Sequence, residues 1–499
     1  MPLAAAASAD DAPPIATTYG PVSGLMVDGV RVFKGIPYAA PPVGELRWKP
    51  PVPPTPWTQP RAAVAFAAAC PQARDRIVPM QAQQSEDCLY LNVWSAQQAE
   101  KLPVMVFIHG GGFSKGSSAQ SYYDSPALAQ HGVVLVTINY RLGDFGFFCH
   151  PALTAESAHH ASGNYGLLDQ VAALQWVHDN IAAFGGDPGR VTIFGESAGA
   201  VSVGLLMASP LARGLFHRAI MESGSAPTRM KTREEMETKG LELQRKLGVA
   251  DGPEALAQLR ALPADKLLVS GAGDDPLPGM SVRNLLCVDG YFLPEAPAKV
   301  FAEGRQAAVP LMAGSNADEG TMWSQRLPIK TVGQWRAMLR VFFKQDAPQA
   351  EALYPVASEG DLPQALSQFI GDLFLAGARR AVRWSQPVQA HTYLYHFTHR
   401  SLISERSGLG VFHGSELVYV FGSLPPSVRQ SPEERALSEM MTGYWTRFAA
   451  TGDPNGGGAV AWPGYTREGD QHLTLDTVPV VGSGLRTAQC DFWGVKQGE

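Results

Sequence analysis

Residues 191–200, VTIFGESAGA, place a glutamate and a serine between glycines, directly after a short apolar run. Residues 191–194 are typical of a buried strand, and the small residues from 198 to 209 are typical of a closely packed helix. Residues 195–199 fit G-x-S-x-G, a sharp turn from strand to helix that lifts a serine hydroxyl above the edge of a sheet. An inert glycine-rich loop fits this pentapeptide as well. The residues that would have to accompany such a serine therefore decide between the two interpretations.

Other apolar segments predict the sheet around this turn. Runs that are apolar on both faces, as in central strands covered by helices, lie at residues 88–94, 103–108 and 133–140. Residues 164–184 carry apolar residues at helical spacing, and GGDPGR at 185–190 ends that helix. Strands that alternate with helices predict an α/β fold with a large, mostly parallel sheet. Helical excursions from this sheet are predicted near residues 230–270 and 330–385.

The composition narrows the classes of function. The chain has 499 residues, of which 45% are apolar and 17% charged, and its net charge is −6. This balance offers no basic surface for nucleic acid, and no apolar run reaches the ~18 residues that span a membrane.

We expect one domain over residues 18–499, after a flexible segment at residues 1–17. This segment lacks the charged and apolar regions of an intact signal peptide. It fits the remnant of a removed signal, which we favour, or a disordered cytoplasmic start.

A serine hydroxyl becomes a useful nucleophile only when a base takes its proton and donors stabilise the oxyanion that forms. Residues 109–113, HGGGF, follow a predicted strand, and consecutive glycines let backbone N–H groups point into a cavity. Candidate donors are the N–H groups of Gly111 and Gly112, with that of Ala198 after the serine. A phosphate-binding loop is the alternative because Lys115 follows. Its spacing does not fit G-x-x-x-x-G-K-[ST], however.

In folds with this turn, an acidic residue and then a histidine follow the serine along the chain. The loop 313–320, AGSNADEG, follows an apolar strand and offers Asp318 and Glu319, which spacing alone does not separate. The later histidines are His391, His396, His399, His413 and His472. Among them His413 lies in the loop GVFHGSEL beside a glycine, which suits a base that must reach the serine.

The other histidines have simpler interpretations. His396 and His399 lie in a predicted strand and are possible metal ligands, but we see no cysteine or carboxylate cluster that would join them. We therefore predict no metal site. His472 is expected to be an exposed residue of a strand.

Several motifs, in this order along the chain, resemble the type-B carboxylesterase family, which includes carboxylesterases and cholinesterases and has the α/β-hydrolase fold. They are FKGIPYAAPP, EDCLYLNVW (86–94), HGGGF, NYRLG (139–143), GGDPGRVTIFGESAGA (185–200), SNADEG and FHGSELVYVFG. The resemblance spans roughly residues 18 to 495. It implies a serine carboxylesterase that acts through an acyl-enzyme on a small-molecule ester. No cofactor or metal is implied, and we expect a monomer or a weak oligomer.

The resemblance also implies a role for each site residue. Ser197 corresponds to the nucleophile, Glu319 to the acid and His413 to the base, so the family favours Glu319 over Asp318. Gly111, Gly112 and Ala198 correspond to the oxyanion hole. Ser223 and Glu196 are expected directly beside the triad residues.

Further correspondences concern the scaffold. The resemblance pairs Cys70 with Cys88 in a disulfide and leaves Cys149, Cys287 and Cys490 unassigned. It also implies the structural ion pairs Arg47–Glu86 and Arg141–Asp169. A disulfide points to an oxidising compartment, so we expect a periplasmic or secreted protein, with the cytoplasm as the alternative.

Departures from the family bear on the substrate. The loop 71–87 contains no aromatic residue, whereas cholinesterases carry there a tryptophan that stacks on quaternary ammonium. This argues against choline esters. Lys115 and Arg229 are two solvated surface charges or, in the alternative, recognise an acyl group with free carboxylates. Tricarballylate esters, which the fumonisin esterases of this family cleave, are one such substrate.

Two other functions are alternatives to this interpretation. A lipase-like esterase of neutral esters would use the same residues. A non-catalytic binding module of this fold would lack the nucleophile or the base, and both are present here.

Overall fold

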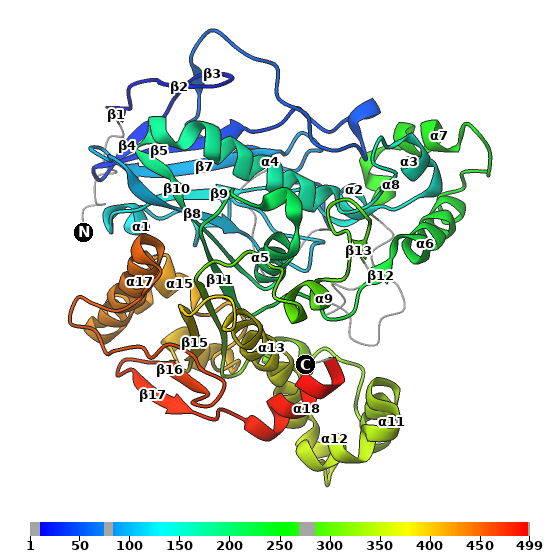
Figure 1. The fold of residues 1–499 in the computed structure, drawn as a ribbon, viewed down its shortest axis with the longest axis vertical. Coiled ribbons are helices and arrows are strands. Elements are labelled where there is room, and N and C mark those ends of the chain that lie inside the picture. Colours follow the sequence, from blue (N-terminus) through cyan, green and yellow to red (C-terminus); the bar gives the residue numbers. More distant parts are fainter. Residues whose placement is uncertain (1–9, 74–82, 269–284, 498–499) are drawn as a thin grey trace.

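The computed structural model describes residues 10–73, 83–268 and 285–497. In this part of the chain, twelve strands form one sheet (Figure 1). In spatial order they are β1 (Asp10–Asp11), β4 (Leu25–Val27), β5 (Val30–Pro37), β7 (Tyr90–Ala96), β9 (Val134–Ile138), β8 (Leu102–Ile108), β10 (Gly186–Glu196), β11 (Arg218–Glu222), β14 (Leu311–Asn316), β15 (Thr392–Phe397), β16 (Gln471–Leu475) and β17 (Val480–Ser483). The strands from β9 to β16 in this order are parallel, and those on either side pair antiparallel.

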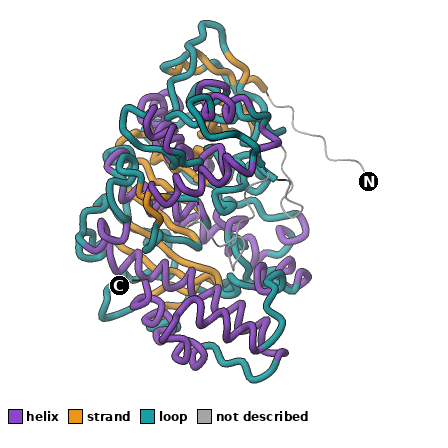
Figure 2. Tube along the Cα trace, turned by 90° about the vertical axis from the view of Figure 1, so that its right-hand side faces the viewer, coloured by secondary structure: helices purple, strands orange, loops and turns teal. Residues whose placement is uncertain are grey.

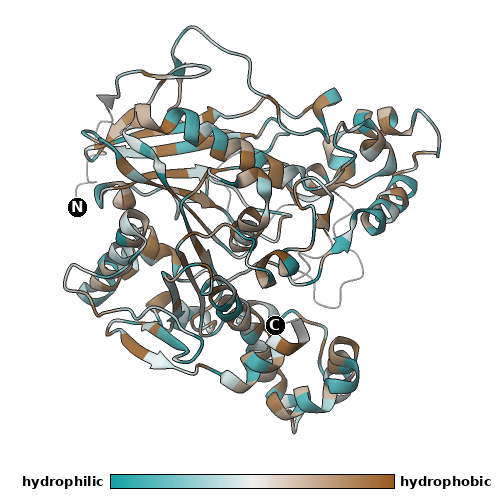
Figure 3. Ribbon diagram, viewed as in Figure 1, coloured by the Kyte–Doolittle hydropathy of each residue, from teal (hydrophilic) through white to brown (hydrophobic). Residues whose placement is uncertain are grey.

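The central strands are buried on both faces, as their sequences predict. In β8, Val104 and Val106 belong to the core on one face, and Met105 and Phe107 belong to the core on the other. The first core is closed by α4 (Tyr165–Asn180), α5 (Ala198–Ala208) and α9 (Pro297–Ala302). The second is closed by α1 (Ala127–Gln130), α15 (Leu417–Val420), α16 (Pro426–Arg429) and α17 (Pro432–Thr451). Figure 2 shows the strands between helices, and Figure 3 shows the apolar colour on the central strands.

The remaining elements surround this sheet. Residues 230–270 contain α6 (Arg233–Lys246), α7 (Ala255–Ala261) and α8 (Ala264–Leu267). Residues 330–385 contain α11 (Val332–Phe343), α12 (Ala347–Leu353) and α13 (Leu362–Ser385), which share a third core with α18 (Thr487–Gln497). The short helices are α2 (Gly143–Phe147), α3 (Pro151–Glu156), α10 (Thr321–Ser324) and α14 (Leu402–Ser407). Two small sheets join β2 (Ile15–Thr17), β3 (Gly20–Ser23) and β6 (Arg61–Ala62), and β12 (Lys231–Thr232) with β13 (Cys287–Val288).

Two expectations about element boundaries differ from the structure. β10 begins at Gly186, which pairs with Leu102 before an irregularity in the ladder, so the segment expected only to end a helix already belongs to the strand. Residues 1–9 of the segment expected to be flexible lie outside the described residues. From Asp10 onward the chain pairs with β4 through β1, so regular structure begins before residue 18.

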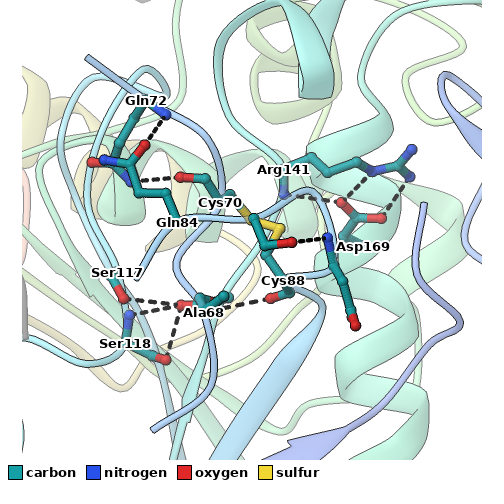
Figure 4. The surroundings of a disulfide bond; sticks show 12 residues. Ala68, Cys70, Gln72, Gln84, Cys88, Ser117, Ser118, Arg141 and Asp169 are labelled. Carbon is teal, nitrogen blue, oxygen red and sulfur yellow. Dashed lines mark hydrogen bonds and ion pairs between the residues drawn. A yellow bond between two sulfur atoms is a disulfide. The ribbon is translucent and has the colours of Figure 1, made fainter. Parts of the chain in front are cut away.

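The predicted scaffold contacts are present. Cys70 and Cys88 form a disulfide, and the two ion pairs are Arg47–Glu86 and Arg141–Asp169. Figure 4 shows the disulfide beside the second of these pairs. The Asn139 side chain of the NYRLG motif donates to the carbonyl oxygen of Cys88 over 3.1 Å and accepts from the Ser118 N–H over 2.9 Å. The disulfide loop is thereby held to the carboxyl end of β9, close to the edge where the candidate site lies.

Candidate active site

Ser197 occupies a strained turn at the carboxyl end of β10. Its φ is +56° and its ψ −119°, a conformation that non-glycine residues rarely adopt, and α5 begins at the next residue. A Cβ atom at Gly199 would lie 1.9 Å from the Ile108 carbonyl oxygen. One at Gly195 would lie 2.7 Å from the same oxygen. Only glycine therefore lets the strand and the helix of this turn approach β8.

The HGGGF loop lies directly against this turn. A Cβ atom at Gly110 would lie 3.0 Å from the Ser197 Cβ. Gly111 and Gly112 have φ of +104° and +63°, so glycine suits both positions. Among the described residues, their N–H groups donate to no backbone carbonyl. The Ala198 N–H, as the first of α5, also lies outside the repeating hydrogen bonds of the helix. The three predicted donors thus lie on either side of the serine turn.

Buried neighbours hold this loop in place. The Gln72 amide donates to the Gly116 carbonyl oxygen and accepts from the Gly116 N–H, both over 2.8 Å. The His109 ring stacks on Tyr140 at 4.4 Å between centroids, and the Tyr140 hydroxyl donates to the His109 carbonyl oxygen. Burial lowers the pKa of His109 to about 4, so this ring is uncharged at pH 7. Its role in the loop is structural.

The acid and the base are brought together by two loops at the same edge of the sheet. Glu319 Oε2 lies 2.6 Å from His413 Nδ1, and Glu319 Oε1 accepts from the Ser223 hydroxyl over 2.5 Å and from the Asn316 N–H over 2.7 Å. The neighbouring Asp318 side chain instead accepts a hydrogen bond from the Val411 N–H over 2.8 Å. Contacts therefore distinguish the two adjacent acids that sequence spacing leaves open.

The second nitrogen of His413 faces Glu196. His413 Nε2 lies 2.9 Å from Glu196 Oε1, and no hydrogen bond between described residues joins it to the Ser197 hydroxyl. Burial by itself lowers the pKa of His413, but the carboxylates of Glu196 and Glu319 outweigh it and raise that pKa well above its usual value. Trp323 and Phe374 pack on the imidazole, each at 4.8 Å between centroids. The imidazole thus lies between two carboxylates that favour its protonated form.

Two further buried carboxyl groups, which the sequence patterns did not predict, lie beside the site. Glu222, at the end of β11, accepts from the Trp445 indole over 2.5 Å, and burial with the Glu196 charge raises its pKa to about 8. Burial also raises the pKa of Glu416 well above its usual value, with the Glu196 charge adding to the effect. The Asn316 amide donates to Glu416. The available signal was their position: Glu416 stands in the motif FHGSELVYVFG, and Glu222 directly precedes Ser223.

Lys115 and Arg229, interpreted as solvated surface charges or as a site for acyl carboxylates, are both exposed. Lys115 closes the HGGGF loop, where its N–H donates to the Gly111 carbonyl oxygen over 3.1 Å. Arg229 lies in the loop that follows β11 and Ser223. These positions put the two cations on loops that leave the same edge of the sheet as Ser197.

Two expectations about histidines were wrong. His472 is buried, because its cross-strand partner on β17 is Gly482, which leaves room for the ring. His399 does have carboxylate neighbours: its Nδ1 lies 3.0 Å from Asp476 and its Nε2 3.1 Å from Glu434. Even so, the described residues hold no group of three or more histidine, cysteine or acidic side chains that could bind a metal. Nor is any helix in the described ranges long and apolar enough to cross a membrane.

Comparisons with known proteins identify the family of this chain. A model of the carboxylesterase family matches residues 11–493. The chain is 41% identical to a fumonisin B1 esterase of Sphingopyxis macrogoltabida, over 94% of this chain and 87% of that protein. It is 38% identical to a para-nitrobenzyl esterase of Bacillus subtilis (strain 168), over 93% and 94% of the two chains. A solved structure of a PNB esterase superposes with a TM-score of 0.83 at 35% identity, covering 95% of this chain and 99% of that one. The chain therefore belongs to the carboxylesterase family, with its α/β-hydrolase fold, and is a carboxylic ester hydrolase.

Proposed function

We propose that the protein hydrolyses carboxylic esters with Ser197 as nucleophile, His413 as general base and acid, and Glu319 as the group that orients His413. The observation that carries this proposal is the 2.6 Å contact between Glu319 and His413 next to a serine held in a strained turn. Glu319 fixes His413 Nδ1 as a donor, which leaves Nε2 to exchange protons. The N–H groups of Gly111, Gly112 and Ala198 are the proposed oxyanion hole, where one donor typically contributes roughly 3 kcal/mol to transition-state stabilisation.

The reaction then follows the two-step route of serine hydrolases. His413 Nε2, once neutral and turned from Glu196 toward Ser197, takes the hydroxyl proton while Ser197 Oγ attacks the ester carbonyl. The tetrahedral oxyanion is bound by the three N–H groups and collapses to an acyl-enzyme, and the alcohol leaves with the proton from His413. Water, deprotonated by His413, attacks the acyl-enzyme and releases the acid. Glu196 influences these steps because it raises the pKa of His413 and faces His413 Nε2.

A covalent label tests the nucleophile separately from any substrate preference. A fluorophosphonate should modify the native protein on the peptide that contains Ser197. Neither the Ser197→Ala variant nor the heat-unfolded protein should react, because reaction needs both the hydroxyl and the assembled site. Label on a different serine, or equal labelling of the Ala variant, would contradict the assignment.

We further propose that the preferred esters carry free carboxylates on the acyl group, as tricarballylate esters of the fumonisin type do. Two exposed cations, Lys115 and Arg229, support this, since they lie on the loops that carry the proposed oxyanion donors and follow Ser223. The 41% identity to a protein named fumonisin B1 esterase supports it as well. Exposed guanidinium and ammonium groups attract carboxylates without desolvating them fully.

Matched substrates distinguish this preference from a general esterase. Replacing Lys115 and Arg229 by Ala should raise KM for a tricarballylate monoester several-fold and leave KM for a neutral ester of similar size unchanged. The control is Arg467→Ala, an exposed cation before the amino end of β16, at the opposite edge of the sheet. Equal effects on both esters would contradict the preference. A sharp rise in activity above substrate solubility would instead favour a lipase-like enzyme of neutral esters.

We propose an oxidising compartment, the periplasm or the exterior, as the place where the protein matures. The Cys70–Cys88 disulfide supports this, since disulfides are rare in the reducing cytoplasm. Cell fractionation of the native host checks the proposal. Recovery of the whole pool in the cytoplasmic fraction would contradict it.

A further inference from the structure

Two thiols outside the candidate active site lie together in the interior. Cys149 precedes α3 and Cys287 begins β13, and their exposed fractions are 2% and 0%. With Met236 of α6 they form a small buried cluster of their own, in which every side chain carries sulfur. Segments far apart in the sequence therefore meet at this cluster.

Both sulfur atoms contact the same short stretch of backbone. Cys149 Sγ lies 3.3 Å and Cys287 Sγ 3.8 Å from the Ser162 carbonyl oxygen, so both thiols lie within hydrogen-bonding distance of one acceptor. A Cβ atom at Gly163 would lie 3.3 Å from Cys287 Sγ and 3.7 Å from Cys149 Sγ. Gly163, whose φ of +83° favours glycine, therefore lies directly against both thiols.

The pair is buried and hydrogen-bonded. A hydrogen bond with the Cys149 thiol, together with burial, raises the pKa of Cys287 well above its ordinary value. The Asn164 amide donates to the Cys287 carbonyl oxygen over 2.8 Å and fixes that backbone. The remaining thiol, Cys490, is buried on α18 and donates to the Leu485 carbonyl oxygen, in a different core. Of the three free cysteines, only Cys149 and Cys287 belong to one cluster.

We propose that Cys149 and Cys287 form a second disulfide when the chain folds in an oxidising compartment. In this reaction a disulfide of a thiol oxidoreductase, or oxidised glutathione, is reduced to two thiols. The Cys149 and Cys287 thiols give up two electrons and two protons, and one S–S bond forms as the other breaks. Because both thiols are buried in the folded protein, the exchange occurs before the cluster closes or when it opens locally.

The cross-link would close a long loop that contains the Ser197 turn and α6 to α8. Long loops lose the most conformational freedom when they are closed in the unfolded chain, so the bond stabilises the fold in the chain-entropy model. It joins the segment after β9 to β13, and Met236 and Gly240 of α6 pack on the same segment. Protein with both disulfides should therefore unfold at a higher temperature than protein with the Cys70–Cys88 disulfide alone.

The test counts thiols and maps linked peptides. The full chain is exported to a bacterial periplasm, or made in the reducing cytoplasm, and is alkylated in denaturant with a chelator so that no metal masks a thiol. The exported protein should show one reactive thiol, Cys490, and a linked peptide pair containing Cys149 and Cys287 that reduction separates. Cytoplasmic protein should show at least three. Exported Cys490→Ser should show none, and exported Cys149→Ser should show two, Cys287 and Cys490.

The same thiol counts can also overturn the proposal. Exported protein with an intact Cys70–Cys88 disulfide but three reactive thiols would show that the pair stays reduced under oxidising conditions. A linkage from Cys490 to either cysteine would equally contradict it. Because Cys149→Ser can disturb packing, its melting temperature is compared with that of the wild type under reducing conditions. Both proteins gain stability from the Cys70–Cys88 disulfide on oxidation, so the wild type should gain more than Cys149→Ser.

Discussion

At the scale of single residues, the site is governed by the two carboxylates that contact the imidazole of His413. Glu319 binds Nδ1 and Glu196 faces Nε2, so the ring lies between two negative groups. Both raise the pKa of His413, and a protonated ring cannot accept the Ser197 proton. The second contact thus opposes catalysis at low pH, whereas the first is needed to orient the ring.

Glu196→Gln should move the acid limb of the pH dependence of kcat/KM to lower pH. The amide keeps the shape of the side chain but removes a negative charge, which lowers the pKa of His413 and makes the neutral ring available at lower pH. Glu196→Asp, which keeps the charge, is the control and should retain an acid limb closer to that of the wild type. An unchanged limb, or a shift to higher pH, would show that Glu196 does not hold the proton on His413.

Glu319→Gln should lower kcat by roughly 10³–10⁴-fold, as loss of the orienting carboxylate does in serine hydrolases. Asp318→Asn is the matched control. The Asp318 side chain accepts a hydrogen bond from the Val411 N–H rather than from the imidazole. The kcat of Asp318→Asn should therefore change little. Steady-state kinetics on one neutral ester decide the matter. A larger loss in Asp318→Asn would reverse the assignment of the acid.

At the scale of elements, the serine turn depends on the close approach of β8, β10 and α5. Gly199→Ala should destabilise the protein by at least the ~1–3 kcal/mol of an overpacked core and abolish activity, because its Cβ would lie 1.9 Å from the Ile108 carbonyl oxygen. In Gly333→Ala, the helix control, the new Cβ meets nothing nearer than 3.8 Å, and stability should be unchanged or slightly higher. Urea unfolding with an ester assay measures both. A fully active Gly199→Ala would contradict the geometry of this turn.

The same scale shows what sequence patterns can and cannot predict. The strands β8 and β9 and the helices α4 and α5 follow from apolar runs and small-residue spacing, because burial on both faces requires such runs. The choice between Asp318 and Glu319 could not follow from spacing, since adjacent side chains point different ways and only the tertiary loop decides which faces His413. The buried Glu222 and Glu416 were missed because glutamate is usually exposed. His472 was misplaced because nothing local reveals that Gly482 makes room for it.

At the scale of the whole molecule, buried acids make stability depend on pH. Glu222 has a pKa of about 8 in the folded protein, well above that of an exposed glutamate, so the folded state binds the extra proton between about pH 4 and pH 8. The free energy of unfolding therefore falls as pH rises through this window.

Glu222→Gln should flatten this dependence. The amide still accepts from the Trp445 indole but does not titrate, so the loss of stability between pH 5 and pH 8 should be smaller than in the wild type. The difference can reach at most about 1.4 kcal/mol per pH unit. Urea unfolding at the two pH values measures it, with Glu468→Gln, an exposed acid, as the control. Equal slopes in the wild type and Glu222→Gln would show that Glu222 is ionised in the folded protein.

The most direct test of the central claim is hydrolysis of p-nitrophenyl acetate and butyrate by the wild type and by Ser197→Ala, with folding of both verified by circular dichroism. The proposed mechanism predicts measurable turnover in the wild type and a loss of several orders of magnitude in the variant, because no other group forms the acyl-enzyme. Turnover that survives the substitution in a folded protein would contradict Ser197 as the nucleophile, and with it the account of the site.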